Sequence, residues 1–147
     1  MSNGFQERIA SIKNKLLSLS EAEDRYAYII ELGRSAAPFP NQWKTKENIV
    51  PGCQSILYLH TETKNGNLFF GAHSEALISA GLAELLIAVY NDTSPRDLLL
   101  NPPTFLQEIG LLASLSPSRS NGLASIYKRM KHEAMQLVLT QSGQTTL

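Results

Sequence analysis

The sequence contains only one cysteine among its 147 residues. One cysteine excludes an internal disulfide, and it cannot supply the several thiolates that hold an iron–sulfur cluster or a structural zinc ion. A lone cysteine in a protein is a buried core residue, an inert surface thiol or a nucleophile. This residue, Cys53, is therefore a candidate for chemistry only if its neighbours in the sequence support that role.

Excess charge and long hydrophobic segments are also missing. Lys plus Arg and Asp plus Glu each number 13, so the net charge is zero. No strong field therefore attracts nucleic acid or an anionic membrane. The first residues lack the basic and apolar regions of a secretory signal, and no segment approaches the roughly 18 apolar residues of a membrane span. We therefore expect a cytoplasmic protein with no nucleic-acid or membrane partner.

The composition is that of an ordinary globular protein. Hydrophobic residues make up 43% of the chain and charged residues 18%, values typical of a folded domain. A chain of this length buries a sufficient core without disulfides or metals. We expect one domain over residues 1–147, with a polar tail at about 141–147 that frays.

Helical periodicity covers most of the chain outside its middle. Apolar residues recur at spacings of three and four in the first 16 residues. Ser20 and Glu23 then form a capping box for a second helix, which ends at Gly33 in the left-handed C′ position. Ser74 is expected to cap a third helix, apolar on most sides and buried. The predicted helices lie at about 5–16, 20–33, 75–90, from 95, at 104–112 and at 117–139.

Strand signals lie in the middle of the chain. Residues 56–61 are rich in strand-forming types, Asn65-Gly66 predicts a tight hairpin turn, and residues 68–70 return as the partner strand. A third short strand is predicted near residues 48–50. Because the order is helices, hairpin and helices, we predict an α+β domain with helices packed mainly on one face of a small antiparallel sheet.

Cys53 stands at the junction between a loop and the first predicted strand, directly after Pro51-Gly52. Proline fixes the direction of the chain, and glycine adopts backbone angles that other residues avoid. Together they present the next side chain in one orientation. An ordinary turn that contains a cysteine fits the same spacing, so the pattern alone leaves both interpretations open.

A second local signal lies at residues 115–123 (Leu-Ser-Pro-Ser-Arg-Ser-Asn-Gly-Leu). Ser116 as N-cap and Pro117 at the first helical position predict the start of the last helix. Arg119 then falls in the first turn, where the helix dipole disfavours a positive charge. This placement indicates a separate role for Arg119, with a solvated surface arginine as the alternative.

The sequence offers no signal for a metal or a cofactor. His60, His73 and His132 lie at no metal-ligand spacing, with His73 expected in a turn and the others on strand or helix faces. There is no phosphate loop, nucleophile elbow or paired-carboxylate signature. We therefore expect the protein to use neither a metal nor a cofactor.

Several segments together resemble the SufE family of sulfur acceptor proteins. They are residues 28–33 (Tyr-Ile-Ile-Glu-Leu-Gly), 50–55 (Val-Pro-Gly-Cys-Gln-Ser), 74–76 (Ser-Glu-Ala) with 81–82 (Gly-Leu), and 115–123. They occur in family order and span about residues 5–139. Glu75 departs from the family pattern, which more often has aspartate there, so no role is carried over to it.

The resemblance implies a SufE/IscU-like fold, in which helices pack on a small antiparallel sheet. The family's acceptor cysteine falls on Cys53 and its motif arginine on Arg119. It also implies that Cys53 takes sulfane sulfur from a cysteine desulfurase (SufS-like) as a persulfide, stimulates that enzyme, and passes the sulfur to an iron–sulfur scaffold (SufB-like). The chain is then a transpersulfuration partner rather than an independent enzyme.

Elementary thiol chemistry agrees with this role. One thiolate is enough to attack the terminal sulfur of a persulfide, because the donor's own thiolate leaves. A free thiol with a pKa near ~8.5 is only a few per cent ionised at pH 7, and Arg119 is expected to favour its thiolate. Two alternatives stay open. One is a cysteine hydrolase, which needs His60, His73 or His132 beside the sulfur; the other is a binding module that activates a partner enzyme, with Cys53 in the core.

Overall fold

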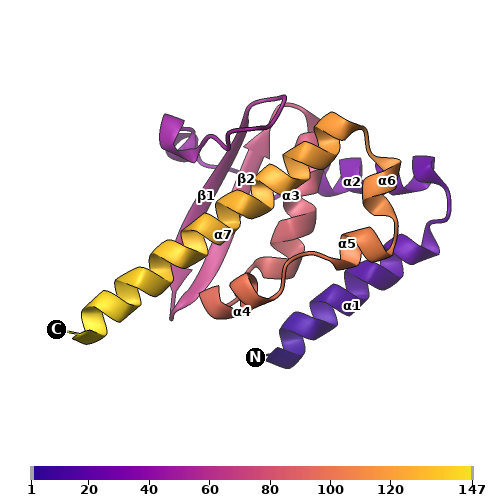
Figure 1. Cartoon of the computed structure of the whole chain (residues 1–147). Coiled ribbons are helices and arrows are strands. Elements are labelled where there is room, and N and C mark those ends of the chain that lie inside the picture. Colours follow the sequence, from indigo (N-terminus) through magenta and orange to yellow (C-terminus); the bar gives the residue numbers. More distant parts are fainter. Residues whose placement is uncertain (1, 147) are drawn as a thin grey trace.

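The computed structural model describes residues 2–146 (Figure 1). The chain forms a β-hairpin in its middle, with helices before and after it. The helices are α1 (Ser2–Ser18), α2 (Ala22–Arg34), α3 (Leu77–Tyr90), α4 (Pro95–Leu100), α5 (Phe105–Glu108), α6 (Leu111–Ser114) and α7 (Pro117–Thr146). The strands are β1 (Leu57–Lys64) and β2 (Asn67–Ser74), and two short 3₁₀ helices precede them, η1 (Asn41–Trp43) and η2 (Lys46–Asn48).

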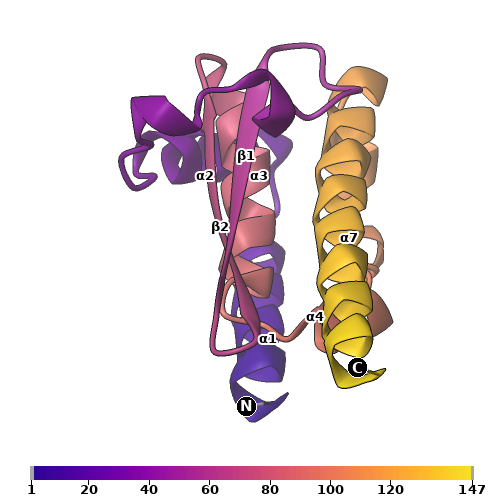
Figure 2. The same ribbon diagram turned by 90° about the vertical axis from the view of Figure 1, so that its left-hand side faces the viewer.

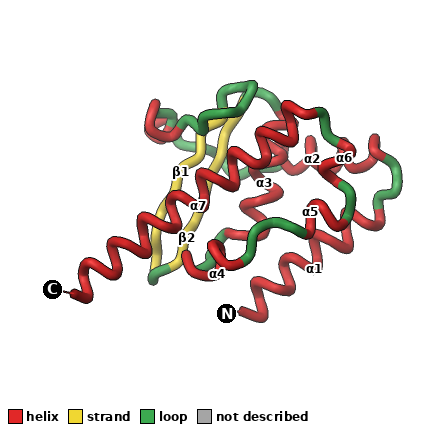
Figure 3. The backbone as a smooth tube through the Cα atoms, in the orientation of Figure 1, coloured by secondary structure: helices red, strands yellow, loops and turns green. Residues whose placement is uncertain are grey.

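Helix α3 lies at the centre of the fold. It contacts α1, α2, α7 and strand β2, and nearly all of its residues from Ala80 onward are buried. Figure 2 shows the hairpin lying over α3, with α7 alongside, and Figure 3 shows how much of the chain is helical. The prediction of an α+β fold with a small antiparallel sheet is thus confirmed. No helix within residues 2–146 is both long and apolar enough to cross a membrane.

The hairpin follows the predicted pattern. Asn65 and Gly66 have φ values of 54° and 82°, the left-handed angles that a two-residue type I′ turn requires. Strand pairing runs from Lys64 opposite Asn67 at the turn to Leu57 opposite Ser74 at the open end. The predicted third strand is reduced to an isolated bridge, in which Ile49 pairs with Tyr58.

The face of the hairpin that points away from α3 is covered by the segment between α2 and β1. The Phe39 ring stacks on Tyr58 and His73, and the Trp43 ring stacks on His60 with centroids 3.7 Å apart. Because His73 is part of β2, its prediction as a turn residue is wrong. Pro38 and Pro40 exclude a longer helix in the first part of this segment, where only the short helices η1 and η2 follow.

Gly33 does not end α2 in a left-handed conformation, as the sequence analysis predicts. It lies within the helix, where α2 crosses α3 so closely that a Cβ atom on Gly33 would lie 2.6 Å from the carbonyl oxygen of Leu77. Gly81 is the matching residue on α3, because its Cβ would lie 1.9 Å from the carbonyl oxygen of Ile29. Both glycines therefore serve helix packing.

Three helix ends differ from their predictions. Helix α2 begins after Glu21 without a side-chain cap, so the predicted capping box of Ser20 and Glu23 does not form; Glu23 and Asp24 in the first turn complement the helix dipole. Ser74 ends β2, and its hydroxyl accepts a hydrogen bond from the Ala76 N–H, while α3 starts at Leu77. The predicted helix at 104–112 is divided into α5 and α6 by Gly110, whose φ is 77°.

The C-terminal helix is longer than predicted. Helix α7 continues to Thr146, through most of the segment expected to fray, and Leu147 lies outside the described residues. The Gln141 amide nitrogen approaches the hairpin turn, where it lies 4.0 Å from the Cβ position of Gly66. Helix α7 thus follows the whole hairpin, from the Cys53 loop to the turn.

Candidate functional site

The loop that carries Cys53 is closed at its base by backbone contacts. The Val50 N–H donates to the carbonyl oxygen of Leu57 at 2.9 Å, and the bridge between Ile49 and Tyr58 lies just outside this bond. Residues 51–56 turn between these contacts. The structure places Cys53 in this turn, half-buried against the hydrophobic core, immediately before β1.

Gly52 fits the loop against α7. Its φ is 90°, a conformation that L side chains rarely adopt, and a Cβ atom would lie 2.5 Å from the Ser125 hydroxyl. Any larger residue here is therefore strained by its backbone and also meets α7. The glycine that the sequence pattern singles out thus determines where the next side chain, that of Cys53, is held.

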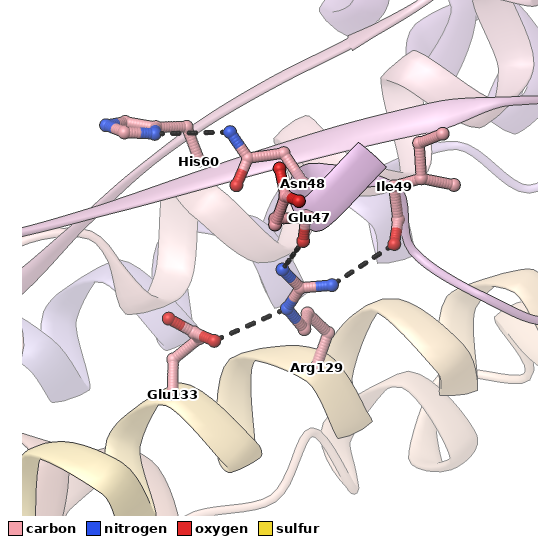
Figure 4. A network of polar contacts seen from close by, with 6 residues as sticks. All are labelled: Glu47, Asn48, Ile49, His60, Arg129 and Glu133. Atoms are coloured by element: carbon pink, nitrogen blue, oxygen red, sulfur yellow. Dashed lines mark hydrogen bonds and ion pairs between the residues drawn. The ribbon is translucent and has the colours of Figure 1, made fainter. Parts of the chain in front are cut away.

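Arg129 ties the chain before the loop to α7 (Figure 4). Its guanidinium donates to the carbonyl oxygen of Ile49 at 3.2 Å and to that of Glu47, while its Nε lies 3.4 Å from a carboxylate oxygen of Glu133. Hydrogen bonds to charged groups each contribute about 1.5–3 kcal/mol. The chain that leads into the Cys53 loop is therefore fixed to the middle of α7.

Cys53 faces a small cavity of about 170 Å³ between its loop, α3 and the first turns of α7. The Cys53 sulfur lies 4.0 Å from the carbonyl oxygen of Gly122, the outer limit for a thiol hydrogen bond. The cavity is lined by Cys53, Gln54 and Ser55, by Ala76, Ile78, Ser79 and Leu82, and by Ser118, Arg119, Gly122 and Ile126. The structure thus brings the two sequence-predicted site residues, Cys53 and Arg119, to one cavity.

The sequence analysis expects Arg119 to favour the Cys53 thiolate, but the surroundings of the sulfur disfavour its ionisation. Burial raises the pKa of Cys53 above its ordinary value, because desolvation disfavours the thiolate. The Arg119 guanidinium lies 5.0 Å from the centre of the Tyr26 ring, in a cation–π contact. Ser116 caps α7 as predicted, accepting from the Arg119 N–H at 3.4 Å. In this conformation Cys53 is therefore a half-buried thiol whose protonated form is favoured.

The three histidines lie outside the cavity that Cys53 faces. His60 stacks on Trp43, His73 lies 3.0 Å from a carboxylate oxygen of the exposed Glu75, and His132 is on the outside of α7. Among the described residues, no histidine lines the Cys53 cavity, so the pair that a cysteine hydrolase needs is not formed. Nor do any three His, Cys, Asp or Glu side chains within residues 2–146 gather closely enough to hold a metal ion.

Sequence reasoning missed Tyr26, Gly122 and Arg129. Arg129 stands four residues before Glu133, a spacing typical of an ordinary surface ion pair on a helix, and nothing local reveals its bonds to the backbone of a distant loop. Tyr26 shows the period of a core residue, and Gly122 forms part of the recognised helix start. Their place at the site depends on tertiary packing that periodicity does not encode.

Comparison with known proteins supplies the family. Residues 10–134 match the domain described as SufE, Fe–S metabolism associated domain. This chain belongs to the SufE family. A protein of Wigglesworthia glossinidia brevipalpis called "Cysteine desulfuration protein SufE" is 34% identical over 142 residues, which cover 95% of this chain and 97% of that protein. The SufE resemblance is thus confirmed, and with it a family-level link to sulfur transfer in iron–sulfur metabolism.

Other relatives agree over most of their length. An uncharacterized SufE-like protein of Rhizobium etli is 35% identical over 135 residues, covering 88% of this chain and 91% of the relative. An uncharacterized SufE-like protein of Synechocystis is 31% identical over 134 residues, which cover 91% of this chain and 84% of that protein. The solution structure of a hypothetical protein from Thermus thermophilus superposes with a TM-score of 0.75 at 22% identity, over 90% of this chain and 96% of that one. This structure shows that the fold is shared.

Proposed function

We propose that this SufE-family chain accepts sulfane sulfur from a SufS-like cysteine desulfurase as a persulfide on Cys53, stimulates that enzyme, and passes the sulfur to a SufB-like scaffold for iron–sulfur cluster assembly. One observation carries the proposal: the only cysteine of the chain faces a cavity that accommodates an added atom. The cavity volume of about 170 Å³ is several times the space of about 30 Å³ that one water molecule takes.

The chemistry requires one sulfur nucleophile and no cofactor. The Cys53 thiol loses its proton to solvent, and the thiolate attacks the terminal sulfur of the donor's cysteine persulfide. A new S–S bond forms on Cys53 as the donor's S–S bond breaks, and the donor cysteine leaves as a thiolate. The persulfide on Cys53 then undergoes the same displacement by a thiolate of the recipient.

Transfer requires the loop to leave its cavity. In the closed conformation Cys53 is half-buried, and this partial cover raises the pKa of its thiol, so ionisation is disfavoured and in-line attack is hindered. The same cover shelters a bound persulfide from oxidants and thiols, which react according to thiolate character and exposure. The closed conformation is therefore a holding state, and transfer takes place from an opened one.

Intact-mass analysis tests the proposal. Purified protein is incubated with a SufS-like desulfurase and L-cysteine, and it is expected to gain one sulfur, about 32 Da, on Cys53, which a thiol reductant removes. Cys53→Ser is the control and is expected to gain nothing and to stop stimulating the desulfurase. Continued stimulation by Cys53→Ser would identify a binding module instead, and an unmodified wild type during desulfurase turnover would refute the acceptor role.

A further inference from the structure

A second, larger hollow adjoins the Cys53 loop. It is an open groove of about 570 Å³, with Pro51 and Gly52 on one side and Ser125, Lys128 and His132 of α7 on the other. The groove therefore shares its wall with the loop that carries Cys53, although Cys53 itself faces the separate cavity described above. A chain seated in this groove would touch the backbone directly beside the sulfur-bearing residue.

The free charge in the groove is positive. Arg129 and Glu133 also line it, but they pair with each other at 3.4 Å, and the guanidinium bonds the backbone before the Cys53 loop. Lys128 is exposed and forms no ion pair within the described part of the chain, and the exposed His132 stands one helical turn further along. The groove thus presents the Lys128 ammonium group without an ion-pair partner among residues 2–146.

The charged residues of helix α7 as a whole are also mainly positive. The chain has 13 Lys and Arg and 13 Asp and Glu. Helix α7 carries four of the basic residues, at positions 119, 128, 129 and 131, but only one acidic residue, at position 133. The rest of the chain is consequently acidic on balance. Although the net charge of the chain is zero, α7 carries an excess of positive charge, and two of its basic residues, Lys128 and Arg129, line the groove beside the Cys53 loop. Such a charge selects and steers partners of opposite sign.

We propose that this groove is the docking site for an acidic segment of the protein that delivers sulfur to Cys53. The inference rests on the proposed function and names a surface for it. An interface of ordinary size covers about 800 Å² on each partner, which is wide enough to include both Cys53 and a groove that begins one residue away. Electrostatic complementarity at that place requires carboxylates opposite Lys128.

The test measures sulfur transfer to three charge variants, Lys128→Glu, Lys128→Ala and Arg96→Glu. The donor is the purified cysteine desulfurase of the same organism, and the readouts are the KM for this chain and its dependence on salt. Arg96 is the matched control, because it is exposed on α4, away from the Cys53 loop. Alkylation of Cys53 in the isolated variants, expected to equal the wild type, shows that the loop is intact.

We expect Lys128→Glu to raise KM about tenfold and Lys128→Ala about threefold at low salt, with kcat changed much less, because rim charges act on association. Salt above about 0.1 M shortens the screening length below about 10 Å, so it should weaken wild-type transfer more than that of Lys128→Ala. Arg96→Glu should match the wild type.

Four results would overturn the inference. An unchanged KM for Lys128→Glu alongside normal persulfide formation would remove the docking site and leave the proposed function intact. An equal loss in Arg96→Glu would reveal a general charge effect. A Lys128-dependent dimer of this chain would assign the groove to a second copy. If the Lys128 variants instead transferred sulfur more slowly from a preloaded persulfide to the scaffold, with an unchanged KM for the donor reaction, the groove would be a docking site for the recipient. Wild type that never gains sulfur would refute the proposed function itself.

Discussion

Replacing Gly52 by alanine should open the Cys53 loop. The native φ of 90° lies in the left-handed region, which costs an L residue about 1–2 kcal/mol. The new Cβ would also lie 2.5 Å from the Ser125 hydroxyl and 3.3 Å from its Cβ. Because the strain disappears when the loop leaves α7, Gly52→Ala penalises the closed conformation more than the opened one.

The magnitude follows from the backbone strain alone. A shift of 1–2 kcal/mol between closed and opened loops multiplies the opened fraction about 5- to 30-fold. If iodoacetamide reacts with Cys53 only in the opened loop, its rate at fixed pH should rise by at least the same factor, because the contact with Ser125 adds to the backbone strain. Adding Ser125→Ala to the Gly52→Ala variant removes the closest contact of the new Cβ. The alkylation rate should then fall part of the way back towards that of the wild type, because the backbone strain remains.

The assay follows alkylation by intact mass, beside a thermal melt of each variant. Gly110→Ala is the matched control, because Gly110 also has a positive φ, of 77°, but a Cβ there would meet no described atom within 4 Å apart from those of its chain neighbours. It should lose stability by a similar backbone strain without faster alkylation. Equal alkylation rates for Gly52→Ala and the wild type would refute the idea that Gly52 holds Cys53 closed.

Three further predictions concern other parts of the molecule. Arg119→Ala should move the midpoint of the pH profile of Cys53 alkylation to higher pH. Tyr26→Leu removes the ring beneath the guanidinium and should move this midpoint to lower pH. Identical profiles for the variants and the wild type would contradict a role for Arg119 at the thiolate. Burial raises the pKa of Glu84 from 4.5 to about 7, so the folded state holds this proton more tightly and wild-type stability falls as pH rises through that range. Glu84→Gln lacks this loss, and its advantage in melting temperature should grow from pH 5 to pH 8. Gly81→Ala places a Cβ 1.9 Å from a backbone carbonyl of α2 and should cost more than about 3 kcal/mol in urea unfolding, at the severe end of single substitutions.

Local chemistry explains what the sequence alone predicts well. The turn at Asn65-Gly66 depends on two residues that accept left-handed angles, and the start of α4 depends on Ser94 capping the Asp97 N–H one residue before Pro95. In each case the residues that decide the structure stand next to one another. The position of Cys53 before β1 is of the same kind, since it follows from the adjacent Pro51-Gly52.

Close approaches between distant segments explain what sequence reasoning could not find. Gly33 has the local signature of a helix C-terminus, but its partner is α3, more than forty residues away in the chain. In the same way, the bonds from Arg129 to the backbone before the Cys53 loop and the contact of Arg119 with Tyr26 arise only when α7 is packed. Arg119 lines the same cavity as Cys53, but its resting partner is the Tyr26 ring rather than the sulfur.

The contacts along α7 imply that access to Cys53 and its reactivity change together. Gly52 against Ser125, and Arg129 on the backbone before the loop, both hold the loop to α7, which also forms one wall of the cavity around the sulfur. Movement of the loop away from this helix exposes the thiol and also ends the burial that raises its pKa. A thiol returned to water has a pKa near ~8.5, which gives a few per cent of thiolate at pH 7. One displacement thus supplies both the path and the nucleophile, so under the proposed function a donor that only opened the loop would also activate Cys53.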